Sequence, residues 1–247
     1  MDAEWIIELE GMDVTHPDAG EETLVRGVNW RIGRGQFWVV GGPPGAGKSS
    51  LLTTAAGLNR PGGGALRIFG RDLAGVTEQE QIEWRQWIGF VFEHGGRLLS
   101  HLTVGENVAL PLRYHRTAPD AETSALVESW LERAGVGGCA DLMPSRLSPR
   151  LQQRLALARA LIMPKSVLFV DNPPGGHNRD SRWWREQLGG LAAQGLTVVV
   201  ASNDFGVWLD KAQHFALVQD GQFSIIGGPE EVKSCADAAW REYVMVN

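Results

Sequence analysis

The most informative segment of this 247-residue sequence is Gly42-Pro43-Pro44-Gly45-Ala46-Gly47-Lys48-Ser49. It fits the pattern G-x-x-x-x-G-K-[ST], in which glycines let backbone N–H groups surround the phosphates of a nucleotide. Residues 37–40 before it are an apolar run typical of a buried strand, and residues 48–58 after it are predicted to form a helix. Because a helix N-terminus favours bound anions, strand, loop and helix together predict binding of ATP or GTP.

Each polar residue of the motif has an expected role. The Lys48 ammonium is expected to reach the β- and γ-phosphates, and the Ser49 hydroxyl is expected to ligate Mg²⁺. The predicted nucleotide-binding set also includes the next residue, and it consists of Gly42, Pro43, Pro44, Gly45, Ala46, Gly47, Lys48, Ser49 and Ser50. The alternative, a glycine- and proline-rich turn without a ligand, is disfavoured by the coincidence of all three elements.

The composition limits the kind of partner. The chain has 23 Lys and Arg against 29 Asp and Glu, a net charge of −6, which predicts no nucleic-acid-binding surface. Its two cysteines, Cys139 and Cys235, lack metal-ligand spacing and are expected to be reduced thiols. The acidic start predicts no signal segment, and no apolar run approaches the roughly 18 residues of a membrane span. Any membrane association is therefore expected to come through a partner.

The remaining patterns predict an α/β chain with a helical insertion. Residues 5–41 have the apolar spacing of strands, as do 65–69, 167–170 and 197–200. Residues 98–161 are mostly helical in pattern, and Thr103 with Glu106 has the form of a capping box. Residues 215–218 and 223–226 are predicted to form a hairpin across Asp220-Gly221.

This order of parts resembles the ATP-binding cassette (ABC) ATPase family over nearly the whole chain. Val91-Phe92-Glu93 stands where the family has a strand end and its Q-loop glutamine, and residues 167–171 match the Walker B strand. The resemblance implies a P-loop NTPase (RecA-like) core with an antiparallel β subdomain and a helical insertion subdomain. Residues 1–247 would then form one ABC ATPase domain, with 1–94 and 163–247 as core and β subdomain and 95–162 as helical subdomain.

The family's LSGGQ signature is replaced here by Leu147, Ser148, Pro149, Arg150 and Leu151. Ser148 is a favourable N-cap and Pro149 suits a first helical turn, so a helix is expected to begin here. Arg150 has two interpretations. In the interpretation that we favour, no partner packs closely against this helix start, so a glycine is no longer required there and arginine is tolerated. In the other, Arg150 supplies positive charge to a nucleotide held by a partner subunit.

Four further positions depart from the pattern that the resemblance implies. The water-polarising glutamate after Asp171 is Asn172, the switch histidine is Asn203, the D-loop aspartate is Asn178, and the Q-loop glutamine is Glu93. Asp171 itself is expected to hold the Mg²⁺ shell through water. Because loss of a general base removes about 10²–10⁴ of rate, the sequence predicts ATP and Mg²⁺ binding with weak or absent hydrolysis, and no confident catalytic residue.

The adenine contact is less well defined. The family usually has an aromatic residue near the end of its first strand, where this sequence has His16. An imidazole can stack on a base, and a surface position at a turn is the alternative that we favour.

Two short segments, residues 107–112 and 142–145, resemble the ATPase subunit of Mla/Mce-type lipid transporters. The resemblance implies an ATP-binding subunit of a lipid or phospholipid transporter, cytoplasmic and peripheral on the inner face of the cell membrane. Its partners would be a multi-pass permease and a second ABC ATPase subunit, in a homodimer or heterodimer. The alternatives are a pseudo-ATPase that binds ATP to stabilise an assembly, and a partner of an active paralogue.

Overall fold

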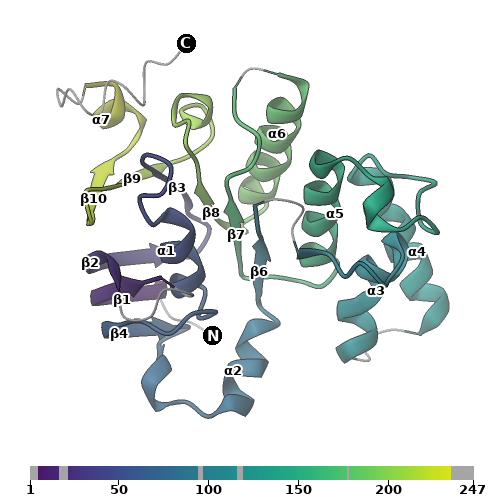
Figure 1. The fold of residues 1–247 in the computed structure, drawn as a ribbon, viewed down its shortest axis with the longest axis horizontal. Helices are drawn as coiled ribbons and strands as arrows, with labels where there is room; N and C mark the ends of the chain where they lie inside the picture. Colours follow the sequence, from purple (N-terminus) through teal and green to yellow (C-terminus); the bar gives the residue numbers. More distant parts are fainter. Residues whose placement is uncertain (1–4, 17–21, 94–96, 116–118, 177, 235–247) are drawn as a thin grey trace.

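The computed structural model describes residues 5–16, 22–93, 97–115, 119–176 and 178–234. Two β-sheets lie side by side, and a group of helices extends away from them at one end of the molecule (Figure 1). The smaller sheet has the order β2-β1-β4-β5 and is antiparallel. Its strands are β1 (Trp5–Thr15), β2 (Thr23–Gly33), β4 (Gly63–Ile68) and β5 (Arg71–Asp72).

The larger sheet has six strands in the order β10-β9-β3-β8-β7-β6. Five of its strands are parallel, and β10 closes one edge as the antiparallel partner of β9. These strands are β3 (Phe37–Gly41), β6 (Ile88–Val91), β7 (Val167–Asp171), β8 (Thr197–Ala201), β9 (His214–Gln219) and β10 (Gln222–Gly227). The predicted hairpin is confirmed, and Asp220 (φ 51°) and Gly221 (φ 74°) form its two-residue turn.

The central strands are buried on both faces, which explains their continuous apolar sequence. All residues of β3, β7 and β8 are buried. Alternate side chains of β3 enter different cores: Trp38 and Val40 pack towards the antiparallel sheet, and Phe37 and Val39 pack towards α5 and α6. The parallel sheet is therefore the partition between two hydrophobic cores.

Helices cover the parallel sheet. They are α1 (Lys48–Ala55), α2 (Glu78–Arg85), α6 (Arg179–Ala193) and α7 (Pro229–Ser234). The helix predicted over residues 48–58 is shorter than expected. It ends at Ala55 because Gly57, with φ 67°, allows the Leu58 N–H to bond back to the Thr53 carbonyl at 2.9 Å.

The helices α3 (Val104–His115), α4 (Asp120–Arg133) and α5 (Pro149–Leu161) form a third hydrophobic core of their own. The Thr103 and Glu106 capping box is confirmed: the Thr103 N–H donates to Glu106 at 2.8 Å, and the Glu106 N–H donates to Thr103 Oγ1 at 3.2 Å. Asn107 is fully buried, and its amide bonds the backbone of residues 99–103. The α/β class and the cassette architecture predicted from sequence are both confirmed.

Half of the ten tryptophans of the sequence lie in the hydrophobic cores. Among the described residues, Trp30, Trp38, Trp84, Trp184 and Trp208 are buried. They fill the space between the sheets and helices, where a large ring buries more apolar area than an aliphatic side chain.

Candidate functional site

The predicted site residues lie at one edge of the parallel sheet. Because β3, β8, β7 and β6 run parallel and adjacent, their carboxyl ends meet there. The segments that follow these strands begin at Gly42, Ser202, Asn172 and Phe92. Ligands of open α/β sheets bind in the crevice outside this edge. The topology therefore brings together motifs that are more than 100 residues apart in the sequence.

The phosphate loop has the backbone that its glycines permit. Gly42 has φ 142°, and a Cβ there would lie 2.0 Å from the Val218 carbonyl oxygen. Gly47 has φ 100° and is the N-cap of α1, so a left-handed residue turns the chain from the loop into the helix. The strand, loop and helix predicted around residues 42–49 are all present.

Lys48 is buried at the start of α1, with 7% of its surface exposed. Its ammonium donates to the carbonyls of Gly42 at 2.7 Å and Pro43 at 2.8 Å, both within the loop. Burial lowers the pKa of Lys48 to about 8, and the carboxylates of Asp171 and Glu93 oppose that shift. The ammonium is thus held at the loop by the carbonyls of Gly42 and Pro43.

Ser49 and Asp171 lie together as a magnesium site requires. Ser49 Oγ donates to Asp171 Oδ1 at 3.0 Å, and Ser49 is exposed at the helix start. Burial raises the pKa of the Asp171 carboxyl, and the Ser49 hydrogen bond lowers it. A hydroxyl and a carboxylate beside a phosphate loop are hard oxygen donors of the kind that Mg²⁺ prefers, so these residues fit the ion.

Asn172 and Glu93 are bonded to each other. Asn172 Nδ2 donates to Glu93 Oε1 at 2.6 Å, although the two residues are 79 positions apart. Asn172 has φ 42°, a left-handed conformation that asparagine tolerates better than most residues. The structure therefore joins two of the four departures into one contact.

Asn178 and Asn203 have different surroundings. Asn178 is the N-cap of α6, and its Oδ1 accepts from the N–H groups of Asp180 at 2.9 Å and Ser181 at 3.0 Å. Asn203 is exposed in the turn after β8. Its neighbour Asp204, which the sequence reasoning did not single out, accepts at Oδ2 from the Gly176 N–H at 3.1 Å. Asp204 thus ties the turn after β8 to the loop after β7.

The signature stretch begins α5 as predicted, with one correction. Ser148 occupies the N-cap position, but its side chain makes no capping hydrogen bond, and Pro149 fills the first helical turn. Leu147 is buried at 8% exposure and Leu151 is half-buried against the third core. Arg150 has 67% of its side chain exposed, and its Nε lies 3.9 Å from Asp180 Oδ2.

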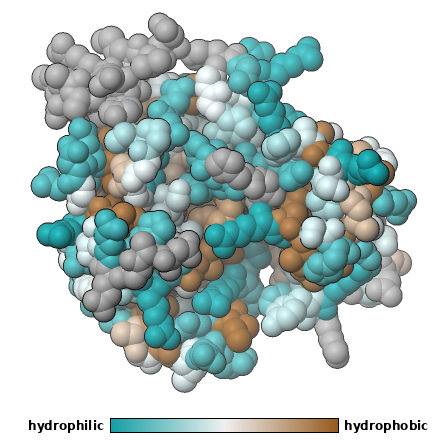
Figure 2. All heavy atoms as spheres, in the orientation of Figure 1, coloured by the Kyte–Doolittle hydropathy of each residue, from teal (hydrophilic) through white to brown (hydrophobic). Residues whose placement is uncertain are grey.

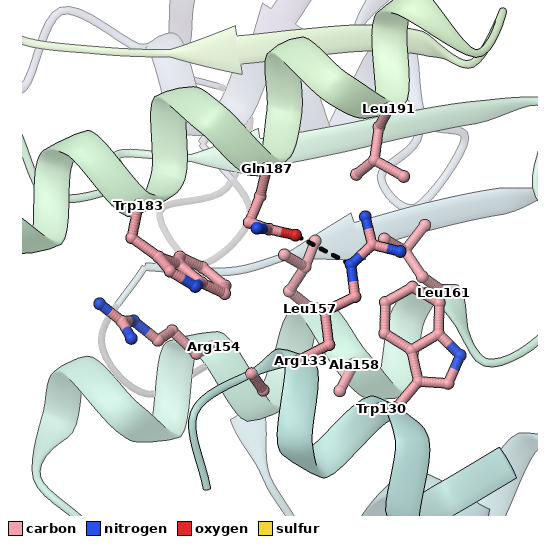
Figure 3. A pocket seen from close by; sticks show the side chains of 10 residues that line it. Trp130, Arg133, Arg154, Leu157, Ala158, Leu161, Trp183, Gln187 and Leu191 are labelled. Atoms are coloured by element: carbon pink, nitrogen blue, oxygen red, sulfur yellow. Dashed lines mark hydrogen bonds between the residues drawn. The ribbon is translucent and has the colours of Figure 1, made fainter.

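Behind this helix start, α5 contacts α6 (Figure 3). Arg154 of α5 lies over the Trp183 ring of α6, with its guanidinium carbon 4.2 Å from the ring centroid. Arg133 Nε at the end of α4 donates to Gln187 Oε1 of α6 at 2.9 Å. These contacts attach the helical group to α6.

The described contacts of His16 and Ser50 are made by their backbone groups and do not test their predicted roles in nucleotide binding. His16 follows β1, is half-buried, and its backbone N–H donates to the Glu22 carbonyl at 3.1 Å. Ser50 lies inside α1, where its carbonyl accepts from the Thr54 hydroxyl at 2.7 Å. Their roles at the nucleotide stay predictions. Cys139 is a half-buried free thiol, and Cys235 lies outside the described residues.

A groove opens between α2 and α3 on the face drawn in Figure 2. Its volume is about 530 Å³. Its lining includes Ile82, Arg85, Tyr114, Arg159 and Lys165. None of the helices in the described part of the chain is both long and apolar enough to cross a bilayer.

Comparison with known proteins places this geometry in a family. A profile described as "ABC transporter" matches residues 25–175. The sulfate/thiosulfate import ATP-binding protein CysA of Mycolicibacterium paratuberculosis (strain ATCC BAA-968 / K-10) is 36% identical over 230 residues, which are 92% of this chain and 60% of that protein. The macrolide export ATP-binding/permease protein MacB 1 of Aeromonas hydrophila is 35% identical over 222 residues, which are 87% of this chain and 33% of that protein.

A solved structure gives the same result for the fold. The dimeric post-hydrolysis structure of the ATP-binding cassette MJ0796 bound to ADP and Pi has a TM-score of 0.80 and 28% identity, covering 90% of this chain and 99% of that one. The chain spans less than two thirds of the length of the curated relatives named above. The phosphate loop, the Ser49–Asp171 pair and these matches together show that this chain belongs to the ABC transporter family.

Proposed function

We propose that this chain is an ATP-binding subunit of a membrane ABC transporter that binds Mg²⁺-ATP and hydrolyses it weakly or not at all. The observation that carries the proposal is Asn172, an amide directly after the magnesium-site residue Asp171 at the carboxyl edge of the sheet. An amide oxygen orients a water molecule but does not accept its proton at neutral pH. The interpretation of the residues at 93, 172, 178 and 203 as departures that weaken hydrolysis is part of this proposal.

Each residue of the site has a separate task in nucleotide binding. Backbone N–H groups of the loop and the N-terminus of α1 hold the phosphates, and Lys48 adds a positive charge. Ser49 and Asp171 would hold Mg²⁺, which when bound supplies positive charge against the phosphate oxygens. Asn203, neutral and exposed, provides no charge where the family has a histidine.

The site is proposed to be completed by a second ATPase subunit. In the ABC family a nucleotide lies between the phosphate loop of one subunit and the signature helix of the other. In a homodimer both sites would lack the glutamate at 172, whereas beside an active paralogue the defect would fall in one site. The exposed Arg150 would face the partner's nucleotide in either arrangement.

A multi-pass permease is the second proposed partner, and it would hold this chain at the inner face of the membrane. The groove between α2 and α3 is the proposed contact, since exposed Ile82 and Tyr114 line it beside Arg85. Residues 95–162 are proposed as the helical subdomain, and 1–94 with 163–247 as the core. Within 95–162, α3, α4 and α5 share their own hydrophobic core, which supports this division.

Lipid or phospholipid trafficking is the proposed cargo class, and it depends on the residues 107–112 and 142–145. The start of α3, which carries the first segment, lies beside the second, because the Val104 N–H donates to the Leu142 carbonyl at 2.8 Å. CysA and MacB 1 are named for sulfate/thiosulfate import and macrolide export at nearly equal identity, and these two are the competing cargo classes. Identification of the permease separates these classes.

The alternative function is a pseudo-ATPase that uses bound ATP to stabilise an assembly. Asn172 favours this alternative as much as it favours weak hydrolysis. It differs in one expectation, because ATP would raise the stability of the complex by mass action while turnover stayed negligible.

The test uses the complex purified from its native cells. ATP binding is measured by calorimetry, turnover by phosphate release, and the subunits are identified by mass spectrometry, with Lys48→Ala as the binding-deficient control. Slow turnover that rises in Asn172→Glu is expected, after a thermal melt has excluded unfolding caused by glutamate at φ 42°. Brisk turnover lost in Lys48→Ala would contradict weak hydrolysis, and a complex without a multi-pass membrane protein would contradict the transporter assignment.

A further inference from the structure

The residues at positions 93 and 172 both depart from the family pattern. Together they carry one carboxylate and one amide, as do the two residues that they replace. The resemblance implies a glutamine at 93 and a glutamate at 172, and this chain has Glu93 and Asn172. One amide and one carboxylate are present in either arrangement, with their places exchanged. The number of carboxylates in the site is therefore preserved, and only the position of one has changed.

The structure shows that the exchanged groups act on each other. The Asn172 amide donates to Glu93 Oε1 at 2.6 Å, so the carboxylate is held at a defined place beside the end of β7. β6 and β7 are paired neighbours in the sheet, which brings the residues that follow them side by side. A hydrogen bond to an ionised acceptor is among the stronger ones, and it restricts the rotamers of the long Glu93 side chain.

The charge of Glu93 acts on the nucleotide-binding groups. Burial is the largest cause of both shifts, lowering the pKa of Lys48 to about 8 and raising the pKa of Asp171; the Glu93 carboxylate opposes the first shift and adds to the second, as expected when one carboxylate lies near both groups. Two carboxylates and one ammonium are thus gathered at the mouth of the phosphate loop. The charges of these three side chains sum to a negative value, which weakens the attraction of the loop for ATP without a metal ion, whereas a bound divalent cation would be attracted by both carboxylates.

We propose that Glu93 and Asn172 form one transposed carboxylate–amide pair that makes this site select metal-bound over metal-free nucleotide. Glu93 supplies the selecting charge, and Asn172 is its positioning residue. The inference rests on the proposed ATP binding and adds the form of the ligand that the site takes. It assigns Glu93 a role in nucleotide selection and Asn172 a role in holding Glu93, neither of which requires hydrolysis.

The test compares ATP affinity in excess Mg²⁺ with ATP affinity in EDTA, by calorimetry on the full chain. Glu93→Gln removes the charge but keeps an oxygen that can accept from Asn172. The two affinities are expected to move in opposite directions: weaker with Mg²⁺ and tighter without it, so that their ratio falls about tenfold. Asn172→Gly fits φ 42° and removes only the positioning amide, and its ratio is expected to fall less.

Glu128→Gln is the matched control, because it removes the same charge from an exposed position on α4. It is expected to leave both affinities unchanged, and a shift like that of Glu93→Gln would overturn the proposal by assigning the effect to net charge. A Glu93→Gln variant whose two affinities move together would overturn it as well. A wild-type ratio in Asn172→Gly would overturn the positioning role. Failure of the wild type to bind ATP in either buffer would instead contradict the proposed function.

Discussion

Arg154 donates a hydrogen bond to Asp180, and this ion pair joins the signature helix α5 to the first turn of α6. Both side chains are largely buried, at 16% and 8% exposure. Neither Asp180 nor Arg154 belongs to a motif named from the sequence. The pair is nevertheless a largely buried ionic contact between the helical group and the core, and the Trp183 ring lies against Arg154.

Asp180→Asn is expected to lower the free energy of unfolding by about 3 kcal/mol, because it leaves the buried Arg154 charge without a counter-ion. Urea denaturation measures the change. Asp210→Asn is the matched control, since Asp210 bonds Arg185 at 2.6 Å but is 52% exposed, and it is expected to cost less than about 1 kcal/mol. Equal losses in the two variants would show that burial does not set the strength of the Arg154 pair.

Gly42→Ala is expected to destabilise the chain by about 3 kcal/mol and to abolish ATP binding. A Cβ at residue 42 would lie 2.0 Å from the Val218 carbonyl oxygen, in a backbone conformation with φ 142°. Thermal melting and calorimetry measure the two effects. Gly190→Ala on α6 has open space around its Cβ, and it is expected to be neutral or stabilising by up to about 1 kcal/mol. Normal ATP affinity in Gly42→Ala would mean that the loop accommodates a side chain by shifting.

Asn178→Ala is expected to lower the free energy of unfolding by about 1 kcal/mol, because two N–H groups at the start of α6 lose their acceptor. Asn178→Asp keeps that acceptor and adds a negative charge at a helix N-terminus, so it is expected to match the wild type or exceed it by about 0.5 kcal/mol. Denaturant titration of both variants checks this order. If aspartate proved as damaging as alanine, the amide rather than the capping oxygen would be what α6 requires.

Stability is expected to rise with pH between about 8 and 10.5. Burial lowers the pKa of Lys165 from 10.5 to about 8, and Lys48 has a pKa of about 8 for the same reason. In this window the unfolded chain binds more protons than the folded chain, so the free energy of unfolding increases as pH rises. Below pH 8 both lysines are charged in both states and the slope disappears.

Lys165→Met is expected to remove about half of that slope, and urea titrations at several pH values measure it. The variant also loses the Lys165 bond to the Gln86 carbonyl at 2.5 Å, which lowers stability by a constant amount without changing the slope. Lys48→Met serves as the parallel control for the other half. An unchanged slope in Lys165→Met would mean that its ammonium stays hydrated in the groove.

Much of the fold was predictable from local pattern. Continuous apolar runs identified β3, β7 and β8, and Asp220-Gly221 identified the hairpin, because these signals depend on neighbouring residues alone. The helix α6 was not predicted. Its adjacent Gly189 and Gly190 weaken helix propensity, and the helix is stabilised by packing Trp184 and Leu188 against the sheet.

The phosphate loop at Gly42 to Ser49 could be identified from sequence alone, because the required glycines, lysine and hydroxyl are contiguous. The departures of Asn172 and Glu93 from the family pattern were visible in the sequence as well. The contact between these two residues follows from the three-dimensional fold, because it depends on β6 lying beside β7 in the sheet. Local sequence encodes backbone conformation and burial, whereas the pairing of distant side chains follows from strand order. Here the order of β6 and β7 brings the two substituted residues, Glu93 and Asn172, into one hydrogen bond.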